Sequence, residues 1–252
     1  MLVLTRGYNE VSPGSRMAKR CTTVEARVAR NAKRISMFRR LILTWFRKEG
    51  RPFPWREPKA SLYAKVVSEI LLQRTRAETV AGFFPRFIHR FPGWKQLAAA
   101  TDEELRVFLE PIGLWRRRAA SLRLLGDEMR AREEHFPKTR EEIEALPGIG
   151  QYIASAVLLF CHGGRQPLLD VNMARLLERC FGRRKLVDIR YDPWLQALSR
   201  QIVDHQRAAE INWAILDLAA TICTIKQPQC ATCPARSCCH YALTSKQAEK
   251  AE

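Results

Sequence analysis

Four cysteines lie close together near the C-terminal end of the chain. Cys223, Cys230, Cys233 and Cys239 are spaced C-x6-C-x2-C-x5-C within seventeen residues. Thiols this close suggest a bound metal, and a structural zinc site is more often built from two C-x2–4-C pairs separated by a long arm. A single C-x2-C flanked by wider gaps suits the larger [4Fe–4S] cube, which four thiolates hold. The alternatives are a zinc knob or disulfides in a secreted protein, and Cys238 competes with Cys239 as the last ligand.

The chain is strongly basic, with 43 Lys and Arg against 26 Asp and Glu and a net charge of +17 over 252 residues. Such a protein usually binds a polyanion, most often nucleic acid, although charge alone does not separate DNA from RNA or an anionic membrane. The apolar run Ile153–Cys161 is about half of what a membrane span needs. We see no signal peptide, so eight cysteines point to a reducing, intracellular compartment.

Helical periodicity recurs throughout the chain, and strand patterns are nearly absent. The sequence therefore predicts an all-α protein of short helices joined by Pro/Gly turns. Thr101–Glu104 and Thr139–Glu142 are T-x-x-E capping boxes that each open a helix. The other helices are expected at 36–50, with Ser36 as the cap, and at 61–75, 77–91, 115–131, 151–161, 172–181, 193–204 and 210–222.

Residues 1–34 carry eight basic side chains against Glu10 and Glu25. We expect a basic, poorly ordered arm. The alternatives are an organellar transit segment, or a start site placed too early with Met17 as the true initiator.

The second strong motif is Leu146-Pro-Gly-Ile-Gly150, which lies between two expected helices. Pro147 ends the first helix, and Gly148 and Gly150 permit positive φ and close approach of another backbone. The amides of such a turn, together with the N-terminus of the next helix, form an anion site, and on a basic protein we expect the anion to be a DNA phosphate. The alternative is a simple connector between two helices.

Some twenty residues further on, Asp170 lies between apolar residues, just before a helix. An acidic residue in this position has an ordinary explanation as the N-cap of that helix. Asn172 could equally cap the helix, which would free Asp170 for chemistry.

Taken together, the hairpin motif, the downstream Asp170 and the terminal cysteine spacing resemble the helix-hairpin-helix DNA glycosylases that carry an iron–sulfur cluster. This superfamily includes endonuclease III, the adenine glycosylase MutY and the mismatch thymine glycosylases. The similarity runs from about Phe53 to Tyr241. It implies an all-α fold of two helical domains with the active site in the cleft between them. Residues 57–164 would form a bundle ending in the hairpin, and residues 35–56 plus 165–252 the cluster domain.

The resemblance also assigns catalytic roles. Asp170 would be the carboxylate that stabilises the oxocarbenium-like sugar and assists the attacking water, and Glu69 an acid that protonates the leaving base. Tyr152 occupies the position at which bifunctional family members carry a nucleophilic lysine. Because a phenol cannot form a Schiff base with the sugar, the expected enzyme is monofunctional.

DNA contacts follow from the same resemblance. Gln73 matches the wedge residue that fills the gap left by a flipped nucleotide. The hairpin residues Leu146, Gly148, Ile149 and Gly150 would bind the backbone. The cysteines Cys223, Cys230, Cys233 and Cys239 would hold a [4Fe–4S] cluster that shapes the loop bearing Lys226, another candidate backbone contact.

The expected reaction is excision of thymine or uracil opposite guanine. Tyr152 and three short segments (69–75, 113–119 and 170–172) resemble the mismatch thymine glycosylases more than the adenine glycosylases. The alternatives are adenine excision from A·G or A·8-oxoG, excision of a modified pyrimidine, and a non-catalytic DNA-binding module. The basic runs 115–118 and 183–185 would add phosphate contacts or be solvated faces. We expect the enzyme to be a monomer of the cytoplasm or nucleoid that acts on double-stranded DNA. An abasic-site endonuclease is expected to act on its product.

Overall fold

The computed structural model describes residues 23–248, with the side chains of residues 23–244. This part of the chain contains helices and turns but no strand, so the predicted all-α class is confirmed. Residues 23–29 are helical. The elements that follow are α2 (Ala32–Glu49), η1 (Pro54–Arg56), α3 (Leu62–Leu72), α4 (Ala77–Arg90), α5 (Trp94–Ala98), α6 (Asp102–Leu109), η2 (Glu110–Ile112), α7 (Trp115–Ala131), α8 (Arg140–Glu144), α9 (Gln151–Cys161), α10 (Val171–Phe181), α11 (Pro193–Val203), α12 (Ala208–Thr221), η3 (Arg236–Cys238) and α13 (His240–Ala248).

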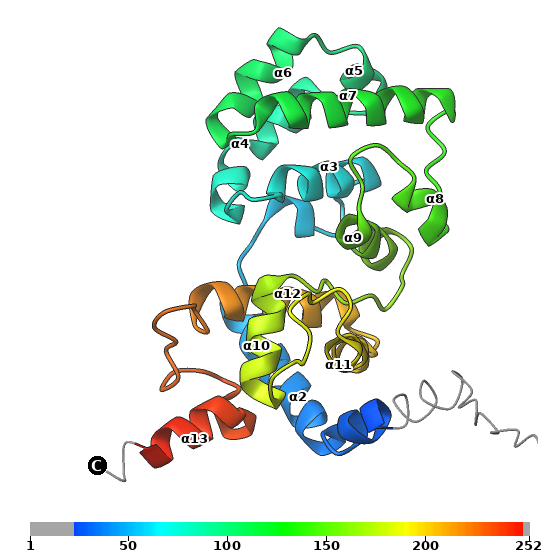
Figure 1. Cartoon of the computed structure of the whole chain (residues 1–252). Coiled ribbons are helices and arrows are strands. Elements are labelled where there is room, and N and C mark those ends of the chain that lie inside the picture. The colour runs from blue at the N-terminus through cyan, green and yellow to red at the C-terminus, as the bar shows by residue number, and fades with distance from the viewer. Residues whose placement is uncertain (1–22, 249–252) are drawn as a thin grey trace, which may run out of the picture.

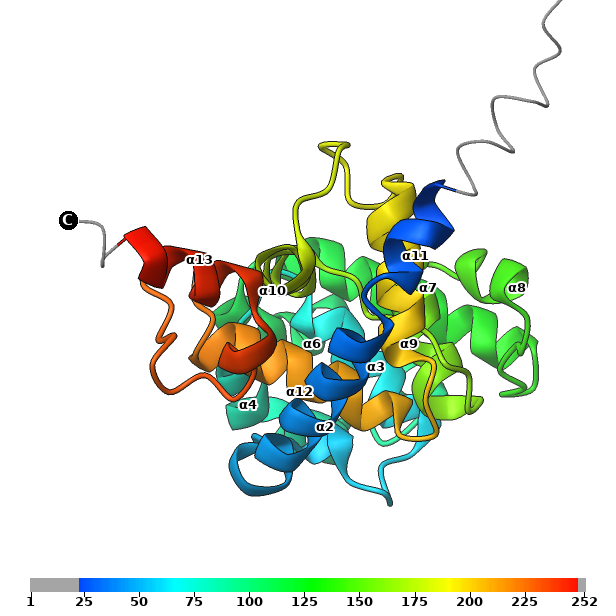
Figure 2. The same cartoon turned by 90° about the horizontal axis from the view of Figure 1, so that it is seen from below.

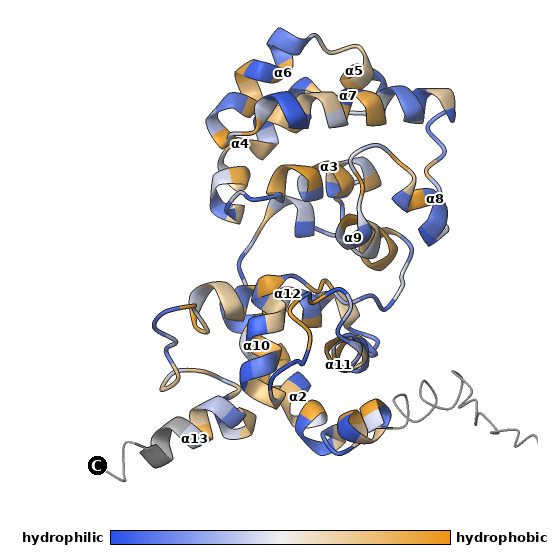
Figure 3. Ribbon diagram, viewed as in Figure 1, coloured by the Kyte–Doolittle hydropathy of each residue, from blue (hydrophilic) through white to orange (hydrophobic). Residues whose placement is uncertain are grey.

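The helices form two groups, one containing α3 to α9 and the other α2 and α10 to α13 (Figure 1). Hydrophobic residues gather where the helices of a group face one another (Figure 3). None of the helices in the described residues is long and apolar enough to cross a membrane.

The first group has its own core, built from residues 53–157. α3 contacts α4, α7 and α9, while α7 also packs along α5 and α6. Phe87, Phe91 and Phe108 pack with ring centroids 5.0–5.9 Å apart in tilted and edge-on arrangements. Such arrangements bring positive ring edges to negative ring faces, which adds to the gain from burying the rings.

The second group has a separate core, to which α2, α10, α11 and α12 contribute. α2 packs against α12, and α10 contacts α11, α12 and α13. Phe38 is fully buried and meets Phe181 edge-on, with the ring centroids 5.4 Å apart. α9 belongs to both cores, because Ile153 and Val157 pack into the first and Ala156 packs into the second.

Two expectations for the N-terminal part are wrong. Ser36 does not begin a helix, because α2 starts at Ala32 and Ser36 lies exposed within it. The poorly ordered arm does not extend to residue 34, because residues 23–29 are helical and Val28 packs into the second core. The guanidinium of Arg27 lies over the ring of Trp194, 3.7 Å from its centroid. Residues 1–22 of the expected arm lie outside the described residues.

A buried carboxylate on α12 holds the linker between α2 and α3. Asp217 is fully buried and accepts hydrogen bonds from the backbone amide and Nε of Arg51, at 2.9 and 2.8 Å, and from both terminal nitrogens of Arg56, at 2.8 and 2.9 Å. Two guanidinium groups thus compensate one buried charge, which alone would be costly to desolvate. The linker that leads into the first helix group is thereby fastened to the second.

We expect Asp217→Asn to lower the free energy of unfolding by about 3 kcal/mol, because it removes the charge but leaves two largely buried guanidinium groups. Urea denaturation followed by circular dichroism measures the change. Glu103→Gln is the control, because its ion pair with Arg106 is exposed on α6 and should contribute nothing measurable. Equal effects of the two substitutions would contradict the role given to Asp217.

Candidate active site

α3 carries Glu69 into the interior. The hydroxyl oxygen of Ser61 accepts a hydrogen bond from the amide of Ala64, 3.1 Å away, and so caps the start of this helix. The rest of α3 is mostly apolar and is covered by α4, α7 and α9. Glu69 therefore lies among buried neighbours, with only 8% of its surface exposed.

The hairpin turn joins α8 to α9 and differs in part from expectation. Gly148 has φ +76°, and a Cβ there would lie 2.8 Å from the Cβ of Ser121, so this position needs glycine. Gly150 is extended, with φ −110°, so positive φ was wrongly expected there; the space beside it is open. Leu146 and Ile149 are buried, and the amide of Ile149 donates to the carbonyl of Leu146 at 3.2 Å. Their side chains hold the turn, so the DNA contacts predicted for Leu146, Gly148, Ile149 and Gly150 would have to be made by the backbone, and they stay a prediction.

Asp170 is the N-cap of α10, so the expectation that Asn172 might serve instead is wrong. Its Oδ1 accepts hydrogen bonds from the amides of Asn172 and Met173, at 3.0 and 2.7 Å. Its Oδ2 accepts one from the side-chain amide of Asn172, at 2.7 Å. The preceding segment is held by buried Asn212, whose side-chain oxygen accepts from the amide of Leu168 at 2.7 Å. Capping therefore fixes the orientation of the carboxylate.

One cavity of about 880 Å³ brings the predicted catalytic residues together with the predicted wedge residue. Glu69 and Gln73 come from the α3 region, Tyr152 from the first turn of α9 and Asp170 from the cap of α10. The cavity therefore lies between the two helix groups, where the resemblance places the active site.

Sequence reasoning missed several residues that line this cavity. Arg51 and Arg56 had no predicted role in the site, yet both line the cavity while bound to Asp217. Phe160 and Trp213 form a stacked pair in its wall, with centroids 5.1 Å apart. The sequence did contain one signal for the two arginines. Asp217 is an acidic residue within an apolar helix, and a buried acidic residue of this kind requires a cationic partner elsewhere in the chain.

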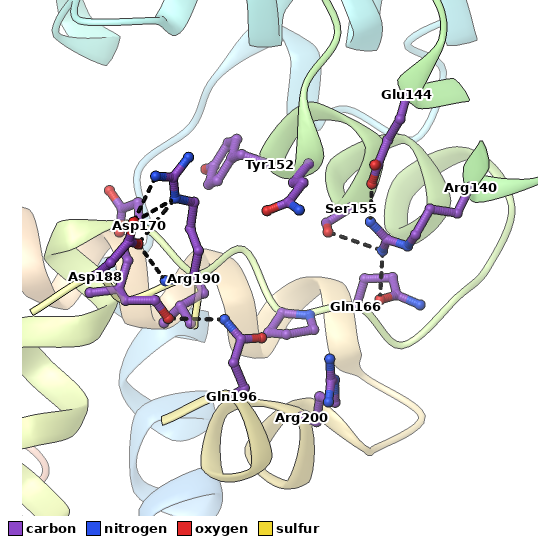
Figure 4. Close-up of a pocket in the computed structure, with 14 residues that line it drawn as sticks. Arg140, Glu144, Tyr152, Ser155, Gln166, Asp170, Asp188, Arg190, Gln196 and Arg200 are labelled. Carbon is purple, nitrogen blue, oxygen red and sulfur yellow. Dashed lines mark hydrogen bonds and ion pairs between the residues drawn. The ribbon is translucent and has the colours of Figure 1, made fainter. Parts of the chain in front are cut away.

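A second cavity, of about 660 Å³, shares Tyr152 and Asp170 with the first. Its other walls come from α8, α9, α11, the segment between α9 and α10, and the loop between α10 and α11. In Figure 4, Arg190 lies at the same end of this cavity as Tyr152 and Asp170, while Arg140 and Glu144 lie at the other end. Tyr152 and Asp170 therefore stand where the two cavities meet.

The surroundings shift the ionisation of two cavity residues. Burial raises the pKa of Glu69 to about 7, although the positive charge of nearby Arg56 acts in the opposite direction. Burial also raises the pKa of Tyr152 well above its usual value, and the negative charges of Glu69 and Asp170 raise it further. The phenol therefore stays neutral at physiological pH, and Glu69 can hold a proton there.

Gln73 is the exposed C-cap residue of α3, and its backbone is fixed by a buried arginine. The guanidinium of Arg118 donates to the carbonyl oxygen of Gln73 and, at 2.7 Å, to the hydroxyl of Thr75. Arg118 is only 3% exposed, so the expectation that it contacts a phosphate or belongs to a solvated face is wrong. Arg116 and Arg117 of the same run are exposed.

The four predicted metal ligands line one pocket near α10, α12 and α13. Cys239 lines it, whereas the competing Cys238 is buried outside it and its thiol donates to the carbonyl of Ala235. Cys180 is a fifth thiol in the wall and is hydrogen-bonded to Cys239, which raises the pKa of Cys180. All seven cysteines from Cys161 to Cys239 are free thiols.

The loop that follows Cys223 is held by arginines of α10. Arg179 donates to the carbonyl oxygens of Thr224 and Ile225, at 2.7 and 2.9 Å, and Arg175 donates to that of Cys223 at 3.1 Å. Lys226 is exposed in this loop. Its side chain is therefore accessible, and its contact with DNA stays a prediction.

Several known proteins are similar to this chain in sequence and fold. Residues 67–189 match the HhH-GPD superfamily of base excision DNA repair proteins. A thymine-DNA glycosylase of Aeropyrum pernix is 38% identical over 213 residues, covering 82% of this chain and 95% of the relative. A thymine/uracil-DNA glycosylase of Pyrobaculum aerophilum is 37% identical over 202 residues, covering 78% of this chain and 87% of the relative.

The human adenine DNA glycosylase is 32% identical over 223 residues, which cover 83% of this chain but 40% of that protein. Among solved structures, a thermostable thymine-DNA glycosylase matches with a TM-score of 0.77 and 27% identity, covering 84% of this chain and 98% of that one. The chain belongs to the HhH-GPD superfamily of base excision DNA repair proteins.

The raised pKa of Glu69 predicts how its replacement changes stability with pH. Below the unfolded-state value of about 4.5 the side chain is protonated in both states, and between there and about 7 it ionises only when unfolded. Wild-type stability should therefore fall across this window, by roughly 3 kcal/mol for a shift of this size. Glu69→Gln should remove that fall, as measured by urea denaturation at pH 4.5, 6 and 8. Parallel pH profiles for the two proteins would contradict it.

Proposed function

We propose that this chain is a monofunctional DNA glycosylase that excises thymine or uracil mispaired with guanine and leaves an abasic site. The observation that carries the proposal is the convergence of Glu69, Tyr152 and Asp170 on one cavity in a member of this repair family. No lysine lines either of the two cavities described above. Glu69, Asp170 and Tyr152 therefore offer two carboxyl groups and a phenol, and neither cavity offers a lysine amine for a Schiff base.

The two carboxyl groups divide the work of breaking the bond between C1′ of the sugar and the base nitrogen. The flipped base enters the larger cavity, whose wall includes the Phe160–Trp213 pair, and meets protonated Glu69. Glu69 transfers its proton to the leaving base. Asp170, oriented by the hydrogen bonds it accepts, stabilises the positive charge that develops on the sugar and assists a water that adds to C1′.

Two relatives support the choice of pyrimidine. The thymine and thymine/uracil glycosylases are 37–38% identical to this chain, which spans 87–95% of their length. The human adenine DNA glycosylase is less similar to this chain, and the matched region covers 40% of its length. Adenine excision is the second candidate, because the same cavity carries the Glu69–Tyr152–Asp170 set.

Base release from duplexes containing G·T, G·U, A·G or A·8-oxoG, with and without alkali, tests the proposal. We expect nicking of G·T and G·U only after alkali. Asp170→Asn should slow release by about a hundredfold or more, since it removes the charge that the sugar requires.

Asp204→Asn is the matched control, because this exposed carboxylate pairs with Arg165 away from both cavities. Nicking of only the adenine duplexes would favour the second candidate. Nicking without alkali would overturn the role of Tyr152, and full activity of Asp170→Asn would overturn that of Asp170.

The proposal includes a [4Fe–4S] cluster held by Cys223, Cys230, Cys233 and Cys239. These residues fit it, because their thiols share one pocket, yet among the described residues no three His, Cys, Asp or Glu side chains gather closely enough to hold a single metal ion. Ligands of a cube each bind a different iron and so stand further apart than ligands of one zinc ion. The cluster would brace the loop that carries Lys226 and take no part in bond cleavage.

Purified protein should be yellow-brown and contain about four irons per chain, as judged by elemental analysis. Cys233→Ser should lose iron because it removes one of four ligands. Cys161→Ser, which lies outside the pocket, should keep it. A colourless protein with stoichiometric zinc would refute the cluster.

The proposed substrate is double-stranded DNA, and the proposed enzyme is a monomer of the cytoplasm or nucleoid. Because hydrolysis leaves an abasic site, an endonuclease specific for such sites would act next.

A further inference from the structure

The loop between α10 and α11, residues 183–191, projects from the body of the protein (Figure 2). Its base is firmly held. Asp192 is 1% exposed, and its carboxylate accepts hydrogen bonds from the amides of Lys185, Leu186 and Leu195, each 2.8–2.9 Å away. Arg27 donates to the carbonyl of Arg183 at 3.0 Å. These contacts fix the base of the loop to the second helix group.

The outer part of this anchored loop is apolar and basic. Val187 is 92% exposed, and Leu186 and Tyr191 are exposed as well. Arg183 and Lys185 are exposed beside them, whereas Arg184 of the same run is held by Glu178 at 2.5 Å. Apolar side chains held in water on a fixed loop indicate a contact surface, and flanking cations indicate an anionic partner.

The far side of the loop borders the candidate active site. Asp188, Ile189 and Arg190 line the smaller cavity, which they share with Tyr152 and Asp170. The guanidinium of Arg190 is paired with Asp188 at 2.6 Å, and Figure 4 shows it at the end of the cavity occupied by Tyr152 and Asp170.

Gln151, the first residue of the hairpin helix α9, also lines this cavity. Asp170, the start of the hairpin helix and the loop therefore all border one cavity, so a DNA strand that contacts Asp170 and the hairpin would lie beside the loop.

We propose that loop 183–191 is a further DNA-binding element. Val187 and its apolar neighbours pack against the sugars of a strand that lies along the loop, whether or not a nucleotide is flipped, and Arg183, Lys185 and Arg190 meet its phosphates. Arg190 exchanges Asp188 for a phosphate when DNA binds. The inference rests on DNA being the substrate, as in the proposed function, but not on the identity of the excised base.

Introducing a charged residue at position 187 tests the proposal most directly. Val187 makes so little contact with the rest of the protein that its replacement should not disturb folding. Binding of the full-length protein to a fluorescent undamaged duplex is measured by anisotropy across a salt series. Val187→Asp should weaken binding about fivefold at low salt, and Val187→Lys should strengthen it by a similar factor. Arg190→Ala should lower the slope of log K against log salt by about 1.

Val107→Asp and Val107→Lys are the matched controls, because Val107 is 61% exposed on α6, which lines neither cavity. Equal effects at positions 107 and 187, or none at 187, would overturn the proposal. Because the duplex contains no mismatch, the result stands whether or not the protein releases a base. If the protein does release a base, the single-turnover rate of base release by Val187→Asp should equal the wild-type rate once enzyme is saturating. A rate defect that persists at saturation would overturn a purely binding role.

Discussion

The fold depends on how a single buried carboxylate is compensated. Asp217 lies in the apolar interior of α12 and is matched by Arg51 and Arg56, which lie 166 and 161 positions away in the chain. An unpaired carboxylate buried this deeply would cost free energy of folding. The contacts of Arg51 and Arg56 with Asp217 therefore hold the linker 51–56 against α12. That constraint sets the entry of the chain into the first helix group. It also holds Arg56 close enough to Glu69 to limit how far burial raises the pKa of that residue.

The chemistry of the site follows from two carboxyl groups in unlike surroundings. Glu69 sits in an apolar helix, where burial favours its neutral form and raises its pKa to about 7. Asp170 accepts hydrogen bonds from two backbone amides and one side-chain amide, which fix the orientation of its carboxyl group. An acid whose raised pKa lets it hold a proton, beside a second acid held in place by hydrogen bonds, can divide the roles of proton donor and charge stabiliser. In the proposed mechanism, capping of α10 would therefore also orient the carboxylate that stabilises the sugar.

Local signals in the sequence were sufficient for much of the fold. α7 and α9 have the predicted bounds, Trp115–Ala131 and Gln151–Cys161, because strong turn residues precede both. The capping box at Thr101 is complete, with Glu104 bonding back to the backbone of Thr101. Ser36 failed as a start because the chain before it continues as helix, which depends on Val28 finding the second core.

The features that sequence reasoning missed are long-range polar contacts. Arg118 looked like one of three equivalent arginines, and only the tertiary fold shows that it alone is buried, where it binds the carbonyl of Gln73. The aromatic wall of Phe160 and Trp213 joins helices α9 and α12, and their 53-residue separation gives no periodic signal. The catalytic set could be named only through resemblance, since neither Glu69 nor Asp170 has a local pattern that separates catalysis from packing or capping.

α9 connects the hairpin turn, where DNA is proposed to bind, to the cavity that contains the proposed catalytic residues. Its N-terminus follows the hairpin turn, its second residue is Tyr152, and its later residues pack into both cores. A phosphate held at the hairpin would therefore be fixed relative to Glu69 through the first core and relative to Asp170 through the second. Since the two carboxyl groups come from different helix groups, a displacement of one group against the other would separate proton donor from charge stabiliser. A helix embedded in both cores opposes that displacement, because the interior packing of either core would have to open first.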